Sequence, residues 1–202
     1  MINQILLRLF VLAGVLSAGA GSAIAQTTNC TGSLAPGNYA ALNVPAGQTC
    51  SVSSGNVSVS GNVTVRTGAS LIVRSPANFT INSSLLAVDA SNVLILASPG
   101  EAPMNILGSV SVTGSTGVVT TQLSFIGGTL SAANSSGALN VFDDSVAGNV
   151  LVRNNQIGGF GIKIGGNAIG GSLVCTGNAS APINSGSPNA VGGNEVGQCS
   201  GL

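Results

Sequence analysis

The sequence predicts an all-β protein whose short strands stack as the rungs of a parallel β-helix, a form of β-solenoid. Three observations support this prediction: period-2 alternation of apolar and polar residues, a recurring Gly- and Asn-rich element, and an unusual composition. Of the 202 residues, 44% are hydrophobic, but only 3% are aromatic and 5% are charged. A core must therefore be built from Val, Ile, Leu and Ala, and the hydrophobic fraction argues against disorder.

The first 25 residues have the features of a secretory signal peptide. A short n-region with Arg8 precedes an apolar run, and Ala23-Ile24-Ala25 forms a small-residue cleavage signal before Gln26. A transmembrane anchor is the alternative, but the apolar run is short for a span of roughly 20 residues, and Gly and Ser interrupt it. We therefore expect cleavage after residue 25.

Cleavage there would leave residues 26–202 as a single domain, exported to the periplasm or the extracellular space without a membrane span. Its four basic and five acidic side chains provide no basic patch for nucleic acid or anionic lipid. The chain has no histidine, which excludes a Ser-His-Asp triad. The sequence does not define an oligomeric state.

Alternating residues predict short strands with one face turned inward. In residues 56–73, the apolar members of this alternation are Val57, Val59, Val63, Val65, Leu71 and Val73. The same pattern returns at residues 109–113 and 149–153. Period-2 alternation bounded by Gly, Asn and Ser is typical of half-buried strands.

A polar residue followed by an aliphatic residue and glycine recurs through the second half of the chain. The clearest copies begin at residues 144, 155, 167 and 189, at intervals of 11, 12 and 22, and a blurred copy begins at residue 178. We expect the leading residues to form a ladder of turn positions that hydrogen-bond from rung to rung: Asp144, Asn155, Asn167, Asn178 and Asn189.

A unit of about 11 residues, doubled to about 22, has the length of one coil of a β-solenoid. Residues 26–202 would then form about seven or eight rungs. The glycines would allow tight corners, and the aliphatic residues would stack as columns inside. The alternative is an immunoglobulin-like β-sandwich, which needs no such register and usually carries a core tryptophan. This chain has none.

Four cysteines in an exported chain indicate disulfides: Cys30, Cys50, Cys175 and Cys199. Three connectivities are possible. We favour Cys30–Cys50 and Cys175–Cys199, because pairs within each end would pin the first and last coils, whose edges would otherwise recruit other strands. The spacings fit neither a zinc site nor a redox C-x-x-C motif.

The C-terminal stretch resembles the end of a group of small exported bacterial proteins described as right-handed parallel β-helix, or pectin-lyase-like, repeat proteins. The matching positions are Gly170, Gly171, Leu173, Cys175, Asn178, Pro182, Gly193, Gly197, Gln198 and Cys199. The early segment GNVTVRTGASLIV also resembles their first rungs. The resemblance implies a right-handed parallel β-helix and export, and it implies no specific activity.

Four charged residues lie between Phe142 and Gly171, and they are the only candidates for catalysis: Asp143, Asp144, Arg153 and Lys163. Two carboxyl groups of a glycosidase stand about 5–9.5 Å apart with split pKa values. Adjacent residues of a strand point to opposite sides, however. Asp144 also fills the asparagine position of the repeat, whereas the repeat does not account for Asp143.

The two cations fit a structural role better than a catalytic one. Arg153 lies 9 residues after Asp144, and Lys163 lies 10 after Arg153. Neither interval matches the repeat, so we expect solvated charges in different columns that discourage sheet stacking. No cofactor is expected. A calcium site at the two aspartates would be weak, because Ca²⁺ takes six to eight oxygen ligands.

We therefore expect an exported, non-enzymatic structural or binding protein of the cell surface or extracellular space, with polysaccharide or envelope material as its partner. The alternative is a minimal or degenerate polysaccharide lyase or hydrolase of the pectin-lyase-like superfamily. It would use the four charged residues between Phe142 and Gly171. Substrate binding without turnover would support the first hypothesis.

Overall fold

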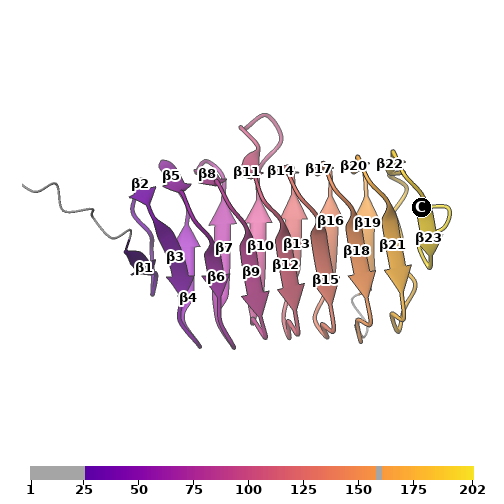
Figure 1. The fold of residues 1–202 in the computed structure, drawn as a ribbon, viewed down its shortest axis with the longest axis horizontal. Helices are drawn as coiled ribbons and strands as arrows, with labels where there is room; N and C mark the ends of the chain where they lie inside the picture. Colours follow the sequence, from indigo (N-terminus) through magenta and orange to yellow (C-terminus); the bar gives the residue numbers. More distant parts are fainter. Residues whose placement is uncertain (1–25, 158–160) are drawn as a thin grey trace, which may run out of the picture.

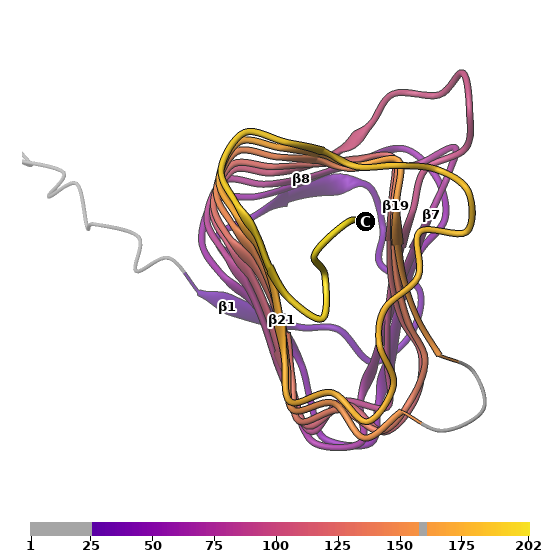
Figure 2. The ribbon, with the colours of Figure 1, turned by 90° about the vertical axis from the view of Figure 1, so that its right-hand side faces the viewer.

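The structure is a computed structural model that describes residues 26–157 and 161–202; the expected signal peptide lies outside this part. The described chain is all-β and winds into about seven turns of a parallel β-solenoid with a triangular outline (Figures 1 and 2). The all-β class and the solenoid prediction are confirmed. Each turn visits three parallel sheets in a fixed order, and we name these sheets A, B and C.

Each sheet is built from strands that lie one turn apart in the sequence. Sheet A contains β1 (Thr27–Asn29), β3 (Ala41–Val44), β6 (Val63–Val65), β9 (Leu85–Val88), β12 (Val110–Thr113), β15 (Leu130–Ala133), β18 (Val150–Arg153), β21 (Leu173–Thr176) and β23 (Glu195–Gly197). Sheet B contains β4 (Thr49–Val52), β7 (Ser70–Arg74), β10 (Asn92–Leu96), β13 (Val119–Gln122), β16 (Leu139–Phe142) and β19 (Ile162–Gly165). Sheet C contains β2 (Gly37–Tyr39), β5 (Asn56–Val59), β8 (Asn78–Ile81), β11 (Met104–Ile106), β14 (Ser124–Ile126), β17 (Ser145–Val146), β20 (Ala168–Ile169) and β22 (Ala190–Val191).

The register gives turns of the length that the repeat predicts. On sheet A, Leu85 pairs with Val110 and Val110 pairs with Leu130, so these two turns take 25 and 20 residues. The longer turn contains a loop of residues 97–103 between β10 and β11, which projects from the corner between sheets B and C (Figures 1 and 2). The first step on sheet A, from Thr27 to Ala41, takes only 14 residues, and the remaining turns take between 20 and 23.

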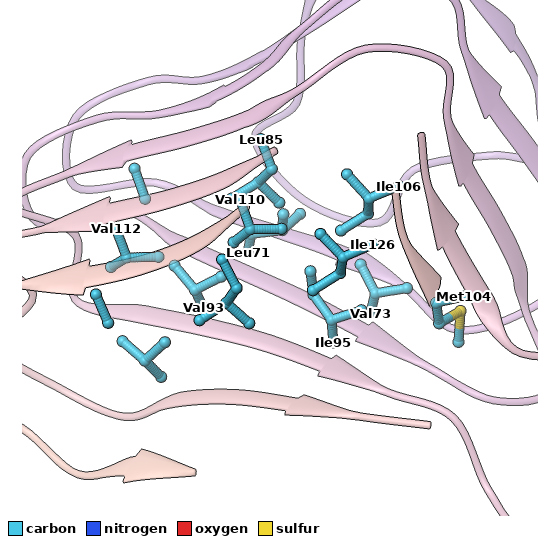
Figure 3. Close-up of a cluster of buried hydrophobic side chains, with 14 of the residues drawn as sticks. Leu71, Val73, Leu85, Val93, Ile95, Met104, Ile106, Val110, Val112 and Ile126 are labelled. Carbon is cyan, nitrogen blue, oxygen red and sulfur yellow. The ribbon is translucent and has the colours of Figure 1, made fainter. Parts of the chain in front are cut away.

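The core is a set of aliphatic columns inside the tube. Figure 3 shows side chains from all three sheets converging on the axis, among them Leu85, Val110, Leu71, Val93, Ile106 and Ile126, each at most 1% exposed. Fully burying one such side chain contributes roughly 1.5–3 kcal/mol. The alternation in the sequence therefore supplies a continuous core with very few aromatic residues.

Glycine pairs explain the corner between sheets C and A, where successive turns approach closely. A Cβ atom on Gly170 would lie 2.5 Å from the carbonyl oxygen of Ala147 in the preceding turn, and one on Gly192 would lie 2.6 Å from that of Gly170. A Cβ atom at such distances would force the backbone to shift, so glycine is favoured at these two positions, although Leu107 and Ala147 hold the corresponding position in earlier turns.

A polar ladder on the outside follows the same corner. In each of six steps, a backbone N–H donates to a side-chain oxygen of the preceding turn at 2.8–3.4 Å. The ladder runs through Asn62, Ser84, Ser109, Thr129, Asn149, Ser172 and Asn194. It satisfies backbone donors that the strand pairing leaves free at the corner.

Both ends of the solenoid carry a disulfide with the expected pairing. The Cα atoms of Cys30 and Cys50 are 5.3 Å apart, and those of Cys175 and Cys199 are 5.2 Å apart. At the C-terminal end, the last residues turn inward across the open end (Figure 2), and the carbonyl of Leu202 accepts a 2.9 Å bond from Asn184 Nδ2. The described residues contain no helix long and apolar enough to cross a membrane.

Candidate functional site

The five residues of the expected ladder lie in two separate ladders at different corners. Asp144, Asn167 and Asn189 follow the corner between sheets B and C, whereas Asn155 and Asn178 follow the corner between sheets A and B. Each ladder has the period of a full turn. The apparent 11-residue repeat thus arises because two of the three corners in each turn use the same kind of residue.

The B–C ladder runs from Ser124 through Asp144 and Asn167 to Asn189. The backbone N–H groups of Ser124, Asp144 and Asn167 each donate to the side-chain Oδ1 of the next residue, at 2.8, 3.0 and 3.2 Å. The amide Nδ2 of Asn167 also donates to the carbonyl oxygen of Val141 at 2.9 Å. An asparagine at this position therefore accepts a hydrogen bond from a backbone N–H with its side-chain oxygen and donates one from its amide to a buried carbonyl.

The A–B ladder runs through Ser115, Ser135, Asn155, Asn178 and Gln198. Its backbone N–H groups donate to the next side-chain oxygen at 2.9–3.2 Å. Gln198 ends the ladder, because its Nε2 donates back to the carbonyl of Asn178 at 2.8 Å. The repeat pattern did not reveal the two serines and Gln198, although each lies one turn from its neighbour.

Asp144 differs from the other residues of the two ladders. When its carboxyl group is ionised, its side chain has no hydrogen to donate in a hydrogen bond. Its Oδ2 is buried without a hydrogen-bond partner, and so is the nearby Thr121 Oγ1. Thr121 pairs with Val141 in the sheet register, so the Thr121 carbonyl corresponds to the acceptor of Asn167 Nδ2. Burial raises the pKa of Asp144 to about 7, although the Thr121 side chain and the Ser124 N–H partly oppose this rise.

Asp143, which the sequence pattern left unexplained, occupies a position where the backbone of neighbouring turns has positive φ. It has φ of 54°, and its counterparts in the neighbouring turns are Leu123 at 53° and Gly166 at 72°. The residue before each of these three ladder positions is therefore in the left-handed region, which Asp and Gly tolerate. Asp143 is exposed while Asp144 is buried, so the adjacent carboxylates point to opposite sides.

The structure does not bring the four charged candidates into one constellation. Arg153 is exposed at the end of β18 on sheet A, whereas Lys163 is half-buried on β19 of sheet B. Asp143 lies at the B–C corner, and Asp144 lies inside. Among the described residues, no group of three or more His, Cys, Asp or Glu side chains could hold a metal ion. Calcium at the aspartates would therefore depend on other oxygen atoms.

A groove of about 340 Å³ lies at the B–C corner beside loop 97–103. We call it the corner groove, and its lining residues are Ser98, Gly100, Glu101, Pro103, Leu123, Ser124, Phe125, Asp143 and Ser145. Phe125 projects outward from β14 and is half-buried, while Glu101 and Asp143 are exposed. Apolar surface with an aromatic ring, bordered by hydroxyl and carboxylate groups, is an arrangement that can hold a polar ring-shaped ligand.

A second hollow of about 420 Å³ lies on the outer face of sheet A near its first strands. Its lining is mainly polar, and Arg66 Nε there donates to Asn43 Oδ1, whose own amide donates to Asn29. These side chains are already linked by hydrogen bonds, and the lining of the hollow includes no aromatic residue. The corner groove is therefore the better candidate site.

No protein-family model, no curated protein and no solved structure matches this chain.

Proposed function

We propose that this chain is an exported, non-enzymatic binding or structural protein of the cell surface or extracellular space, and that it binds a glycan in the corner groove. The observation that carries the proposal is the outward-facing Phe125 beside the two exposed carboxylates. The flat apolar face of a sugar ring packs on an aromatic ring, and its hydroxyl groups donate to carboxylates.

Export is supported by two features. Two disulfides indicate a non-cytoplasmic environment. The leader with its Ala23-Ile24-Ala25 signal fits cleavage before Gln26. N-terminal sequencing of the exported protein should begin at Gln26, whereas an intact leader would contradict the export route.

Binding without turnover is the expected behaviour, because the buried Asp144 carboxyl cannot contact a substrate. Incubation with polygalacturonate or alginate, with and without Ca²⁺, should release neither unsaturated products nor new reducing ends. Turnover that disappears in Asp143→Asn would replace this proposal with an enzymatic one.

Calorimetric titration with neutral oligosaccharides tests the binding site. Phe125→Ala should weaken binding about tenfold or more, since it removes the apolar platform for the sugar. Val88→Ala is the matched control, because Val88 is 54% exposed on sheet A, a different face of the tube. Unchanged affinity in Phe125→Ala, or the absence of any glycan binding, would refute the assignment.

A further inference from the structure

We infer that the corner groove selects glycans that carry free amino groups, and that it disfavours the uronate polymers bound by acidic-polysaccharide enzymes. This inference rests on the proposed glycan-binding function and adds the charge class of the ligand. It follows from the charge of the groove, from the place of each carboxylate, and from the position of the basic residues elsewhere on the tube.

Both charged residues that line the groove are acidic. Glu101 belongs to loop 97–103, and Asp143 belongs to the corner before β17. The loop leads into β11, and β17 lies two strands further along sheet C. The two carboxylates therefore come from opposite sides of the groove, since the loop belongs to the turn of β11 and Asp143 to the turn of β17.

The apolar surface lies between these two sources of charge. Leu123 and Phe125 belong to the turn between the loop and Asp143, and Pro103 adds apolar surface from the loop. A sugar ring that packs on Phe125 would present its ring substituents toward the carboxylates. An ammonium substituent pairs with a carboxylate there, whereas a uronate carboxylate would be repelled.

None of the basic residues of the described chain lines the groove. Arg66 is bonded to Asn43 at the outer face of sheet A, and Arg153 lies on the same sheet. Lys163 lies on β19 of sheet B. Arg74 ends β7 at the same corner, where it pairs with Leu96 one turn before the groove, but it is not among the lining residues. A polyuronate would find no basic side chain in the lining of this groove, and Arg74 is the nearest candidate at the same corner.

Calorimetric titration with three hexasaccharides tests the inference: β-1,4-linked glucosamine, the same chain fully N-acetylated, and galacturonate. An exposed ion pair changes affinity by up to about fivefold. The amine-bearing hexamer should therefore bind about 5- to 25-fold more tightly than the acetylated one, and galacturonate most weakly. The difference should shrink as salt is raised, because exposed charges are screened.

Neutralising variants identify the groove as the source of the preference. Glu101→Gln combined with Asp143→Asn should remove the preference for the amine while the acetylated hexamer still binds. Asp89→Asn is the matched control, since Asp89 is another exposed aspartate at positive φ, in the A–B corner. Asn suits the backbone of both positions, because Asn134 and Asn154 adopt the same conformation.

The outcomes separate this inference from the function on which it rests. Equal binding of the amine-bearing and acetylated hexamers, or tighter binding of galacturonate, would overturn the charge class while leaving glycan binding intact. Failure of all three hexamers to bind would overturn both. A preference that persists in the double variant, or equally tight binding of a lysine oligomer, would also contradict a glycan amine site in this groove.

Discussion

Replacing Asp144 by asparagine should stabilise the solenoid at neutral and alkaline pH. The residue occupies a ladder position at which Asn167, one turn later, donates from Nδ2 to a buried carbonyl at 2.9 Å. In Asp144, the corresponding Oδ2 has no partner. A protonated carboxyl can donate from this position, whereas a carboxylate cannot. Asparagine supplies the donor at every pH and keeps an Oδ1 to accept from Ser124 N–H.

The size of the effect follows from the pKa of Asp144 in the two states. Folding raises this pKa from 3.8 to about 7, chiefly through burial. Stability from this group is therefore complete below about pH 4, falls by roughly 1.4 kcal/mol per pH unit as the pH rises toward 7, and is constant above. The total loss is about 4 kcal/mol. Asp144→Asn has no titrating group here and should escape it.

Urea unfolding of the disulfide-intact protein between pH 4 and pH 8 measures this difference. The two proteins should have similar unfolding free energies at pH 4, and the variant should be more stable by about 4 kcal/mol at pH 8. Subtracting the two curves cancels the titration of all other groups. Asp143→Asn is the matched comparison: it removes a charge that makes only the smallest contribution to the raised pKa of Asp144, so it should reduce the pH dependence far less than Asp144→Asn does.

Parallel pH profiles for the wild type and Asp144→Asn would refute the reasoning. They would mean that the Asp144 carboxyl titrates alike in the folded and unfolded states. A variant that is less stable than wild type at pH 8 would refute it more directly, because the amide would then fail to serve as the missing donor.

Three further substitutions test the corners of the solenoid and the disulfide at its C-terminal end. Asn155→Ala should cost about 2–4 kcal/mol in urea unfolding, because it leaves two buried backbone groups of the preceding turn, the Ser135 N–H and the Ala132 carbonyl, without partners. Gly170→Ala should cost about 1–3 kcal/mol by the same assay, since its Cβ would meet a backbone carbonyl, whereas Gly32→Ala should be nearly neutral because nothing lies within 4 Å. Joint replacement of Cys175 and Cys199 by serine should lower the free energy of unfolding by about 2–4 kcal/mol, because the unfolded chain is no longer cross-linked over 24 residues. An unchanged urea midpoint would show that the last coil is held in place without the disulfide.

The fold was predictable because a solenoid repeats its constraints along the chain. Residues such as Val63 and Val65 alternate because each turn has an inside and an outside, and their burial follows directly. The turn length followed from the recurrence of asparagine and glycine. The disulfide pairing followed from the position of the cysteines near each end. These features depend on local pattern, which a single sequence displays.

The corner groove was not predictable in the same way. The cluster of Pro and Gly in residues 97–103 signals a loop, but the groove also needs Phe125 and Asp143, which lie far along the chain. Only the register brings them to the loop, and one added residue in a turn would carry them to another face. The 11-residue spacing was also ambiguous, because it did not show that alternate copies belong to different corners.

Leu123 is an unusual residue at the B–C corner, and it also lines the corner groove. At the A–B corner, the positions with positive φ are occupied by Gly, Asp or Asn: Gly47, Gly68, Asp89, Gly114, Asn134, Asn154 and Gly177. These types tolerate the left-handed region, which costs other residues roughly 1–2 kcal/mol. Leu123 has φ of 53°, so its backbone is destabilised by about this amount. Its side chain packs against the core and lines the groove beside Phe125, so the departure from the repeat supplies apolar surface where the ligand is expected to bind.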